Sequence, residues 1–122
     1  MKPRIIKANS IPETQTYERC SIAENYSDQD VSLARARVKI GETTVWHHLN
    51  GVQEIYLIAK GHGKVEVGNL KAEEVKGGDV VVIPPGVSQR ITNLGKNDLV
   101  FFCICTPKFT VNCYIDEEAK KR

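Results

Sequence analysis

Turn-forming residues recur at short, regular intervals between residues 41 and 98 and separate runs of apolar or alternating residues. The expected turns lie at residues 50–51, 61–63, 68–69, 76–79 and 84–86. They leave about eight short strands and no amphipathic helix of ordinary length. This pattern is typical of an antiparallel sandwich or barrel, so we predict an all-β fold.

The chain has 122 residues, enough for one domain and too few for two of ordinary size. Its net charge is +2, and basic and acidic residues are mixed along the sequence. The only basic run is at residues 120–122, so we expect no nucleic-acid partner. We divide the chain into an N-terminal arm at 1–30, a barrel domain at 31–110 and a short C-terminal tail at 111–122.

Three local predictions complete this division. The arm contains one strand-like stretch around residues 17–23, and a short strand is expected at 70–75. In the tail, only residues 116–122 look helical.

No apolar stretch is long enough for a signal peptide or a transmembrane helix, so we expect a cytoplasmic protein without a membrane partner. The four cysteines form no CxxC pair, and free thiols are expected in a reducing compartment. Cys103 and Cys105 are two residues apart and share a strand face. They belong either to a pocket wall or to the core, and we favour core packing.

Residues 31–40 alternate in the manner of a strand, with Arg35 and Arg37 on one face and Ala34 and Ala36 on the other. If the arginines face outward, the small alanines leave room for a ligand inside. The alternative turns the arginines inward, toward an anionic substrate. We favour the outward orientation because unpaired buried guanidinium groups are costly.

The stretch from residue 41 to residue 61 contains two of the three histidines. Residues 45–49 and 52–58 look like strands, and Asn50-Gly51 predicts a two-residue hairpin turn. That register places His47 opposite Glu54, with Cβ atoms about 4.5–5.5 Å apart. Both side chains would then reach one small ion or one substrate.

Several predicted strands are apolar on both faces, notably 55–58, 80–83 and 100–104. A single barrel has one interior, so the second apolar face needs a cover. We expect a homodimer to supply it, although a second sheet of the same chain would do part of this.

Two stretches resemble the paired signature motifs of the cupin family. The first motif reads Gly41, five residues, His47, one residue, Leu49, four residues, Glu54, six residues, Gly61. The second reads Gly78, five residues, Pro84, one residue, Gly86, two residues, Gln89, three residues, Asn93. The resemblance covers roughly residues 31–106 and implies a jelly-roll β-barrel with a metal site inside. Residues 32–39 and 101–109 also resemble small single-domain cupins labelled as sugar-phosphate isomerases.

Carried over residue by residue, His47 matches the first histidine of the cupin site and Glu54 matches the glutamate. Leu49 and Gln89 stand where the second and third histidines are expected. The implied metal ligands are therefore His47, Glu54 and Gln89. His48 points to the opposite face of a regular strand, and only a bulge would bring it inward.

The resemblance implies a divalent metal, with zinc, manganese, iron and nickel all compatible with these donors. One hypothesis is a metal-dependent isomerase or lyase that acts on a sugar or small oxygenated metabolite. In it, Glu54 moves a proton and the Tyr56 hydroxyl donates a hydrogen bond. The alternative is a metal-free module that binds a small molecule without chemistry. Its pocket would be lined by Tyr56, Ile91 and the Ala34/Ala36 face.

Two further residues receive packing or surface roles. Trp46 is expected in the core or at an interface, and His62 in an exposed turn.

Overall fold

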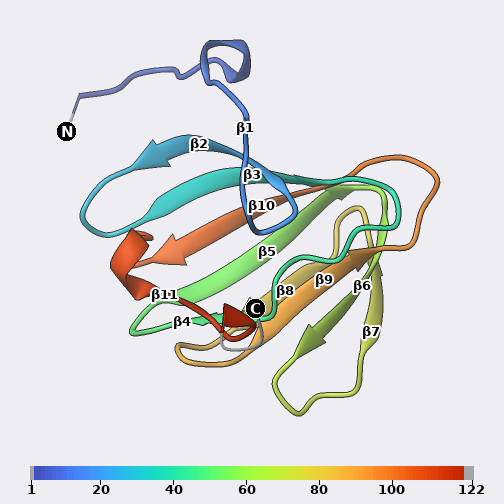
Figure 1. Ribbon diagram of the computed structural model, residues 1–122. Helices are drawn as coiled ribbons and strands as arrows, with labels where there is room; N and C mark the ends of the chain where they lie inside the picture. Colours follow the sequence, from blue (N-terminus) through green and yellow to red (C-terminus); the bar gives the residue numbers. More distant parts are fainter. Residues whose placement is uncertain (1, 120–122) are drawn as a thin grey trace.

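The computed structural model describes residues 2–119, which form two antiparallel sheets facing each other (Figure 1). The larger sheet has the order β1 (Thr14–Gln15), β2 (Ser21–Ser27), β3 (Ser32–Val38), β10 (Leu99–Thr106), β5 (Gln53–Lys60), β8 (Val80–Ile83). The smaller sheet has the order β11 (Tyr114–Asp116), β4 (His47–Leu49), β9 (Gln89–Asn93), β6 (His62–Val67), β7 (Glu73–Lys76). The predicted all-β fold is confirmed.

The helical elements within residues 2–119 are two single 3₁₀ turns, η1 (Ala8–Ser10) and η2 (Val111–Cys113), and Ala119 at the end of this range also has 3₁₀ structure. None of the helices in this range has the length and apolar character needed to cross a membrane.

The predicted hairpin at Asn50-Gly51 is wrong, because β4 and β5 belong to different sheets. A type I′ turn needs positive φ at both central residues, and here only Gly51 has it, at +70°. The Asn50 N–H donates to the Cys113 carbonyl at 2.8 Å, and the Leu49 carbonyl accepts from Gly86 N–H at 2.8 Å. Segments distant in sequence therefore take the backbone groups that a hairpin would have paired.

The strand expected at residues 70–75 begins later, as β7 at Glu73–Lys76. Residues 68–70 are part of a turn, in which Gly68 has a φ of +52° and Leu70 N–H donates to the Val67 carbonyl at 3.0 Å. Leu70 is 74% exposed, so it has no inner face of a sheet to pack on.

Both ends of the chain add strands to the barrel. Strand β2 pairs with β3 along most of its length, so residues 21–27 of the expected arm extend the larger sheet. Strand β11 pairs with β4 in the smaller sheet. Asp116 is therefore in a strand, not in the predicted helix, and residues 120–122 of that helix lie outside the described residues.

Strand β3 alternates as predicted, with its arginines outside and its alanines inside. Arg37 binds Glu13 at 3.0 Å and Asp98 at 3.2 Å on the outer surface. Arg35 lies 3.7 Å from the same Glu13. Glu13, in the segment before β2, thus pairs with both guanidinium groups. These ion pairs offset the free-energy cost of partly burying the two charges.

Two apolar clusters fill the space between the sheets. The larger contains Ile58, Ile83, Ile91 and Leu99, each at most 1% exposed. The smaller contains Leu49, Val52, Cys105 and Cys113, with Phe109 and Tyr114 packed against it. A cavity lies where the packing between the sheets is incomplete, and its walls include members of both clusters.

Candidate functional site

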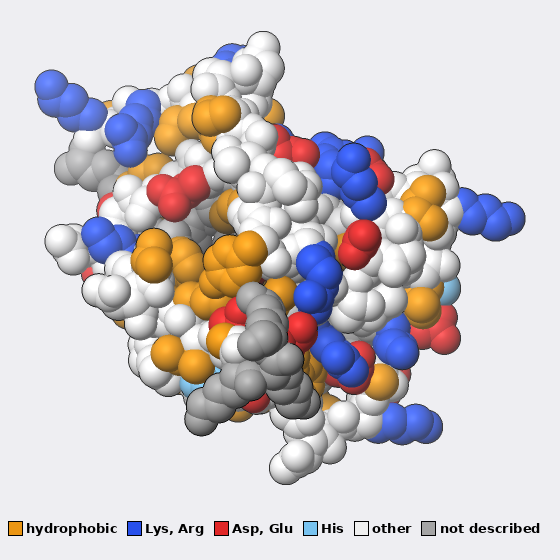
Figure 2. All heavy atoms as spheres, in the orientation of Figure 1, with side chains coloured by type: hydrophobic (Ala, Val, Ile, Leu, Met, Phe, Trp, Pro, Cys, Tyr) orange, Lys and Arg blue, Asp and Glu red, His pale blue; other side chains and the backbone are white. Residues whose placement is uncertain are grey.

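The cavity has a volume of about 150 Å³ and is walled by inner-face residues of β2, β3, β5 and β10 on one side and of β4 and β11 on the other. Ala34 and Ala36 lie in its wall, as predicted for small inward residues. Figure 2 shows hydrophobic side chains gathered around a hollow near the centre of the visible face. An apolar cavity of this size holds a ligand about as large as benzene.

His47 enters the cavity from β4 in one defined tautomer. Its Nδ1 lies 2.7 Å from the Val45 carbonyl oxygen, which can only accept, so Nδ1 carries the proton and Nε2 keeps its lone pair. The ring stacks on Tyr114 with centroids 4.8 Å apart and planes at 21°. Burial lowers the pKa of His47, so the imidazole is neutral at pH 7.

Glu54 reaches the same cavity from β5 and is 7% exposed. Burial raises its pKa from 4.5 to about 7, and the charge of Glu18 adds to this effect. Its Oε2 accepts a hydrogen bond from the Cys105 thiol at 3.7 Å, whereas its Oε1 has no hydrogen-bond partner. The carboxyl group is thus poised to give or take a proton near neutral pH.

Gln89 and Tyr56 form a polar contact beside Glu54. Gln89 is completely buried, and its carbonyl oxygen accepts the Tyr56 hydroxyl. Its amide lies near enough to Glu54 to lower the pKa of that carboxyl, yet Gln89 Nε2 makes no hydrogen bond of normal geometry. Burial raises the pKa of Tyr56 well above its ordinary value, so the hydroxyl stays protonated.

The cavity brings together His47, Glu54 and Tyr56, and Gln89 lies next to it, but not all of their donor atoms are free to bind a metal. The Gln89 oxygen is engaged by Tyr56, and one Glu54 oxygen is engaged by a thiol. Two unengaged donors remain, whereas a catalytic zinc site typically uses three protein ligands. Within the described part of the chain, no three His, Cys, Asp or Glu side chains are arranged to hold a metal ion.

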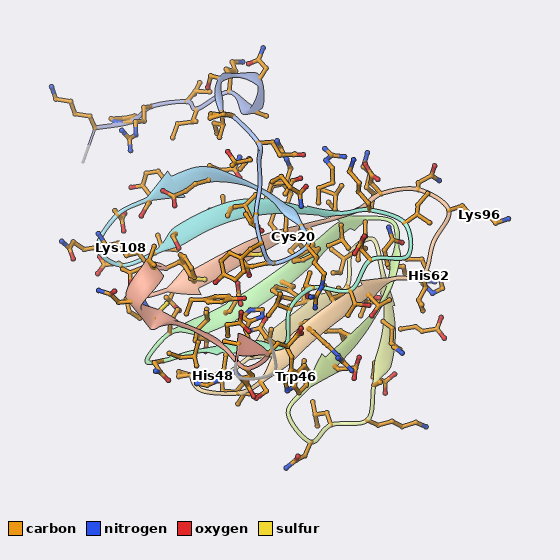
Figure 3. The ribbon with its side chains drawn as sticks, viewed as in Figure 1. Cys20, Trp46, His48, His62, Lys96 and Lys108 are labelled. Carbon is orange, nitrogen blue, oxygen red and sulfur yellow. The ribbon has the colours of Figure 1, made fainter. Side chains whose placement is uncertain are left out.

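The other two histidines lie outside the cavity, as predicted. His48 Nδ1 is 3.0 Å from Glu117 Oε2, and His62 Nε2 is 2.6 Å from Glu74. His62 is exposed, as predicted, but it is the first residue of strand β6 and not part of a turn. Trp46 is half-buried beneath Arg90, whose guanidinium carbon lies 5.1 Å from the ring centroid. Figure 3 shows His62 and Lys96 at the outer edge of the molecule and Cys20 near its middle.

The four cysteines are free, as predicted, but the packing role favoured for Cys103 and Cys105 is incomplete. Both line the cavity together with Cys20. The small residues of β3 opposite β10 leave this space open, so the thiols face a void. Burial raises the pKa of Cys20 to about 12 and raises the pKa of Cys103 well above its ordinary value, so these sulfurs are thiols and not nucleophilic thiolates.

Sequence analysis missed Glu18 and Tyr114, because they lie in the segments assigned to the arm and the tail. Both line the cavity, and the Tyr114 ring covers His47. Burial raises the pKa of Glu18. No local pattern indicates that the two chain ends meet at one site. Ile91, expected in the wall, is fully buried in the larger apolar cluster instead.

Comparison with known proteins identifies the family to which this fold belongs. Residues 34–105 match the sequence profile described as Cupin domain. The chain belongs to the cupin family. It is 34% identical over 110 residues to an uncharacterized protein of Methanocaldococcus jannaschii, covering 90% of this chain and 83% of that one.

Two solved structures are similar in fold. KdgF from Halomonas sp. has a TM-score of 0.81 and 13% identity, with 88% of this chain and 96% of that chain covered. Pac13, a nucleoside dehydratase, has a TM-score of 0.79 and 12% identity, with 94% and 91% covered. Streptomyces Pac13 has also been solved with uridine. At these identities the likeness establishes the cupin fold and leaves the chemistry of this cavity to its own residues.

Proposed function

We propose that this cupin binds a small oxygenated metabolite in its cavity and moves a proton on it, in an isomerase or lyase reaction. The carrying observation is the meeting of two proton-handling groups in one buried cavity: the neutral His47 imidazole and the Glu54 carboxyl with a pKa of about 7. General acid–base catalysis works best when the pKa of the acting group lies near the working pH.

In this proposal the ionised Glu54 carboxylate removes a proton from the substrate and returns it to a neighbouring atom, while neutral His47 Nε2 accepts a hydrogen bond from a substrate hydroxyl. Tyr56 holds the Gln89 amide in place through its hydroxyl, and we propose that Gln89 Nε2 donates to the bound oxygen. A ligand oxygen would satisfy this buried N–H group, whose isolation is otherwise costly. Pac13, whose fold is similar, is a nucleoside dehydratase, which supports a lyase reaction.

That this function requires a divalent metal stays a prediction. The proton transfer described above uses side chains only. Elemental analysis of untagged protein, with His47→Ala and Glu54→Ala variants, tests it. A stoichiometric metal that both substitutions remove would establish zinc, manganese, iron or nickel at His47, Glu54 and Gln89. Wild-type protein without metal, whose melting temperature none of these ions raises, would end that hypothesis.

Proton transfer is tested by following hydrogen exchange in heavy water by NMR. Aminoacetone, hydroxyacetone and pyruvate serve as small carbonyl probes with positive, neutral and negative charge. We expect chelator-treated wild type to accelerate exchange beside the carbonyl of at least one probe, and Glu54→Gln to lower the rate roughly 10²–10⁴-fold. Exchange no faster than in Glu54→Gln for all three probes would overturn the proposal.

We also propose a homodimer formed through the outer face of the larger sheet. Leu57 on β5 and Val80 and Val82 on β8 are 38%, 56% and 56% exposed on adjacent strands. Ile55 and Ile104, both half-buried, extend this apolar strip across β5 and β10. Light scattering tests the dimer: Val82→Lys should give a monomer, and a wild-type monomer at micromolar concentration would contradict it.

A further inference from the structure

The ionisable side chains around the cavity provide negative charge and no opposing positive charge. Glu18, Glu24 and Glu54 line it, and the neutral His47 is the only basic group among the lining residues within 2–119. Both arginines of β3 lie outside, bound to acidic partners. A phosphate or carboxylate ligand would therefore meet acidic groups without an opposing cation.

The carboxyl groups of Glu18 and Glu54 line the same cavity, so their negative charges repel each other. A bound cation would relieve this repulsion.

Aromatic rings provide a second attraction for a cation. Tyr56 and Phe101 pack with centroids 4.6 Å apart in the cavity wall, and Tyr114 and Phe109 lie 6.4 Å apart at the other side. An ammonium group within about 6 Å of such a ring is attracted to its face, more strongly where water is excluded.

Buried polar atoms without a hydrogen-bond partner indicate which other polar groups the ligand has. Glu54 Oε1 is buried, lies in the cavity wall and has no partner, so it can accept from a ligand donor. Gln89 Nε2 is buried next to the cavity and near Glu54, and it makes no hydrogen bond of normal geometry. A ligand with a donor next to an oxygen would satisfy both atoms.

We propose that the substrate is a small amine with a hydroxyl or carbonyl oxygen beside its ammonium group, and that phosphorylated and carboxylated metabolites are excluded. This inference rests on the proposed function, because it assigns the charge of the ligand at that same site. The ammonium lies against Glu54 and Glu18, and the neighbouring oxygen accepts from Gln89. A cavity of about 150 Å³ limits the ligand to roughly benzene size.

The test compares three probes of similar shape: serinol, glycerol and glycerate, which are positive, neutral and negative. Titrations of the protein at pH 8, where Glu54 is mostly ionised, follow the ring signals of His47 and Tyr114 by NMR. We expect serinol to bind roughly tenfold more tightly than glycerol and to outcompete glycerate by a larger factor. Glu18→Gln should reduce the preference for serinol over glycerol several-fold, while Glu73→Gln on exposed β7 leaves it unchanged.

Equal or tighter binding of glycerol or glycerate would overturn the charge assignment while leaving the binding cavity in place. Failure of serinol to shift the His47 and Tyr114 signals in a saturable way would also overturn it. Because these titrations measure binding without turnover, a failure of proton transfer would appear separately, in the exchange experiment.

Discussion

The two ends of the barrel interior share strands β5 and β10 but have different properties. At one end, Ile58, Ile91 and Leu99 from both sheets pack in an apolar cluster. At the other, small residues on β3 leave a cavity that is edged by Glu54, Gln89 and three thiols. The first end stabilises the fold, and the second end keeps polar atoms buried without full satisfaction.

From this difference we infer that the cavity lowers the stability of the fold. A buried carboxyl with a raised pKa and an unpartnered amide both destabilise the folded state. Such groups persist in proteins mainly where a ligand or a reaction uses them.

Ile91→Ala at the packed end should lower the free energy of unfolding by about 2–5 kcal/mol, because it removes a fully buried side chain and leaves a void. Urea denaturation measures the loss. Leu70→Ala, at a 74% exposed turn position outside the proposed dimer face, is the control and should cost far less. A similar loss in both variants would mean that Ile91 stabilises the fold no more than an exposed side chain does.

Glu54→Gln at the cavity end should stabilise the protein at pH 8. The folded state raises the pKa of Glu54 from 4.5 to about 7, so it holds the proton more tightly than the unfolded chain does. Stability is therefore greatest below pH 4.5 with respect to this group, falls as the pH rises toward 7, and has lost about 3 kcal/mol above it.

Urea denaturation at pH 5 and pH 8 checks this sign. The wild type should lose stability between the two values relative to Glu54→Gln, which cannot titrate. Glu66→Gln is a matched control, because the Arg90 ion pair lowers the pKa of Glu66. Identical pH dependence in wild type and Glu54→Gln would show that this carboxyl is not perturbed.

Leu49→His should convert the cavity into a metal site. Leu49 lines the cavity at the position of the second cupin histidine, so the new imidazole adds the missing donor to His47 and Glu54. Zinc at 100-fold above its Kd would stabilise this variant by about 3 kcal/mol, seen as a rise in melting temperature. Leu49→Gln should show little rise, and an equal rise in wild type would mean that its own residues already complete a site.

His48→Gln should have the smallest effect, at most about 1 kcal/mol, because His48 contacts Glu117 at a half-exposed site outside the cavity. Serinol binding should be unchanged, whereas His47→Gln should weaken it. Equal effects at the two neighbouring histidines would contradict the assignment of the inner face to His47.

Residues governed by local rules could be predicted from sequence. Strand alternation placed Ala34 and Ala36 inside and Arg35 outside, and the motif spacing found His47, Glu54 and Gln89. The Asn50-Gly51 turn was misread, because its local hairpin preference is overridden by hydrogen bonds to residues far along the chain.

The ends of the chain could not be predicted in the same way. Glu18 and Tyr114 are 96 residues apart and meet at the cavity only because β2 and β11 join different sheets. Pairing of this kind depends on the whole topology and not on a local pattern. The acidic character of the cavity therefore emerged only from the structure.

The most direct test of the proposed acid–base centre is a pH titration of the Glu54 carboxyl carbon by NMR in chelator-treated protein. Glu66 is observed in the same spectra. We predict an apparent pKa of about 7 for Glu54 and a value below the ordinary range for Glu66. Serinol should lower the Glu54 value, because an ammonium favours the ionised carboxylate. A Glu54 carboxyl that titrates near 4.5 with and without serinol would contradict the proposed acid–base centre.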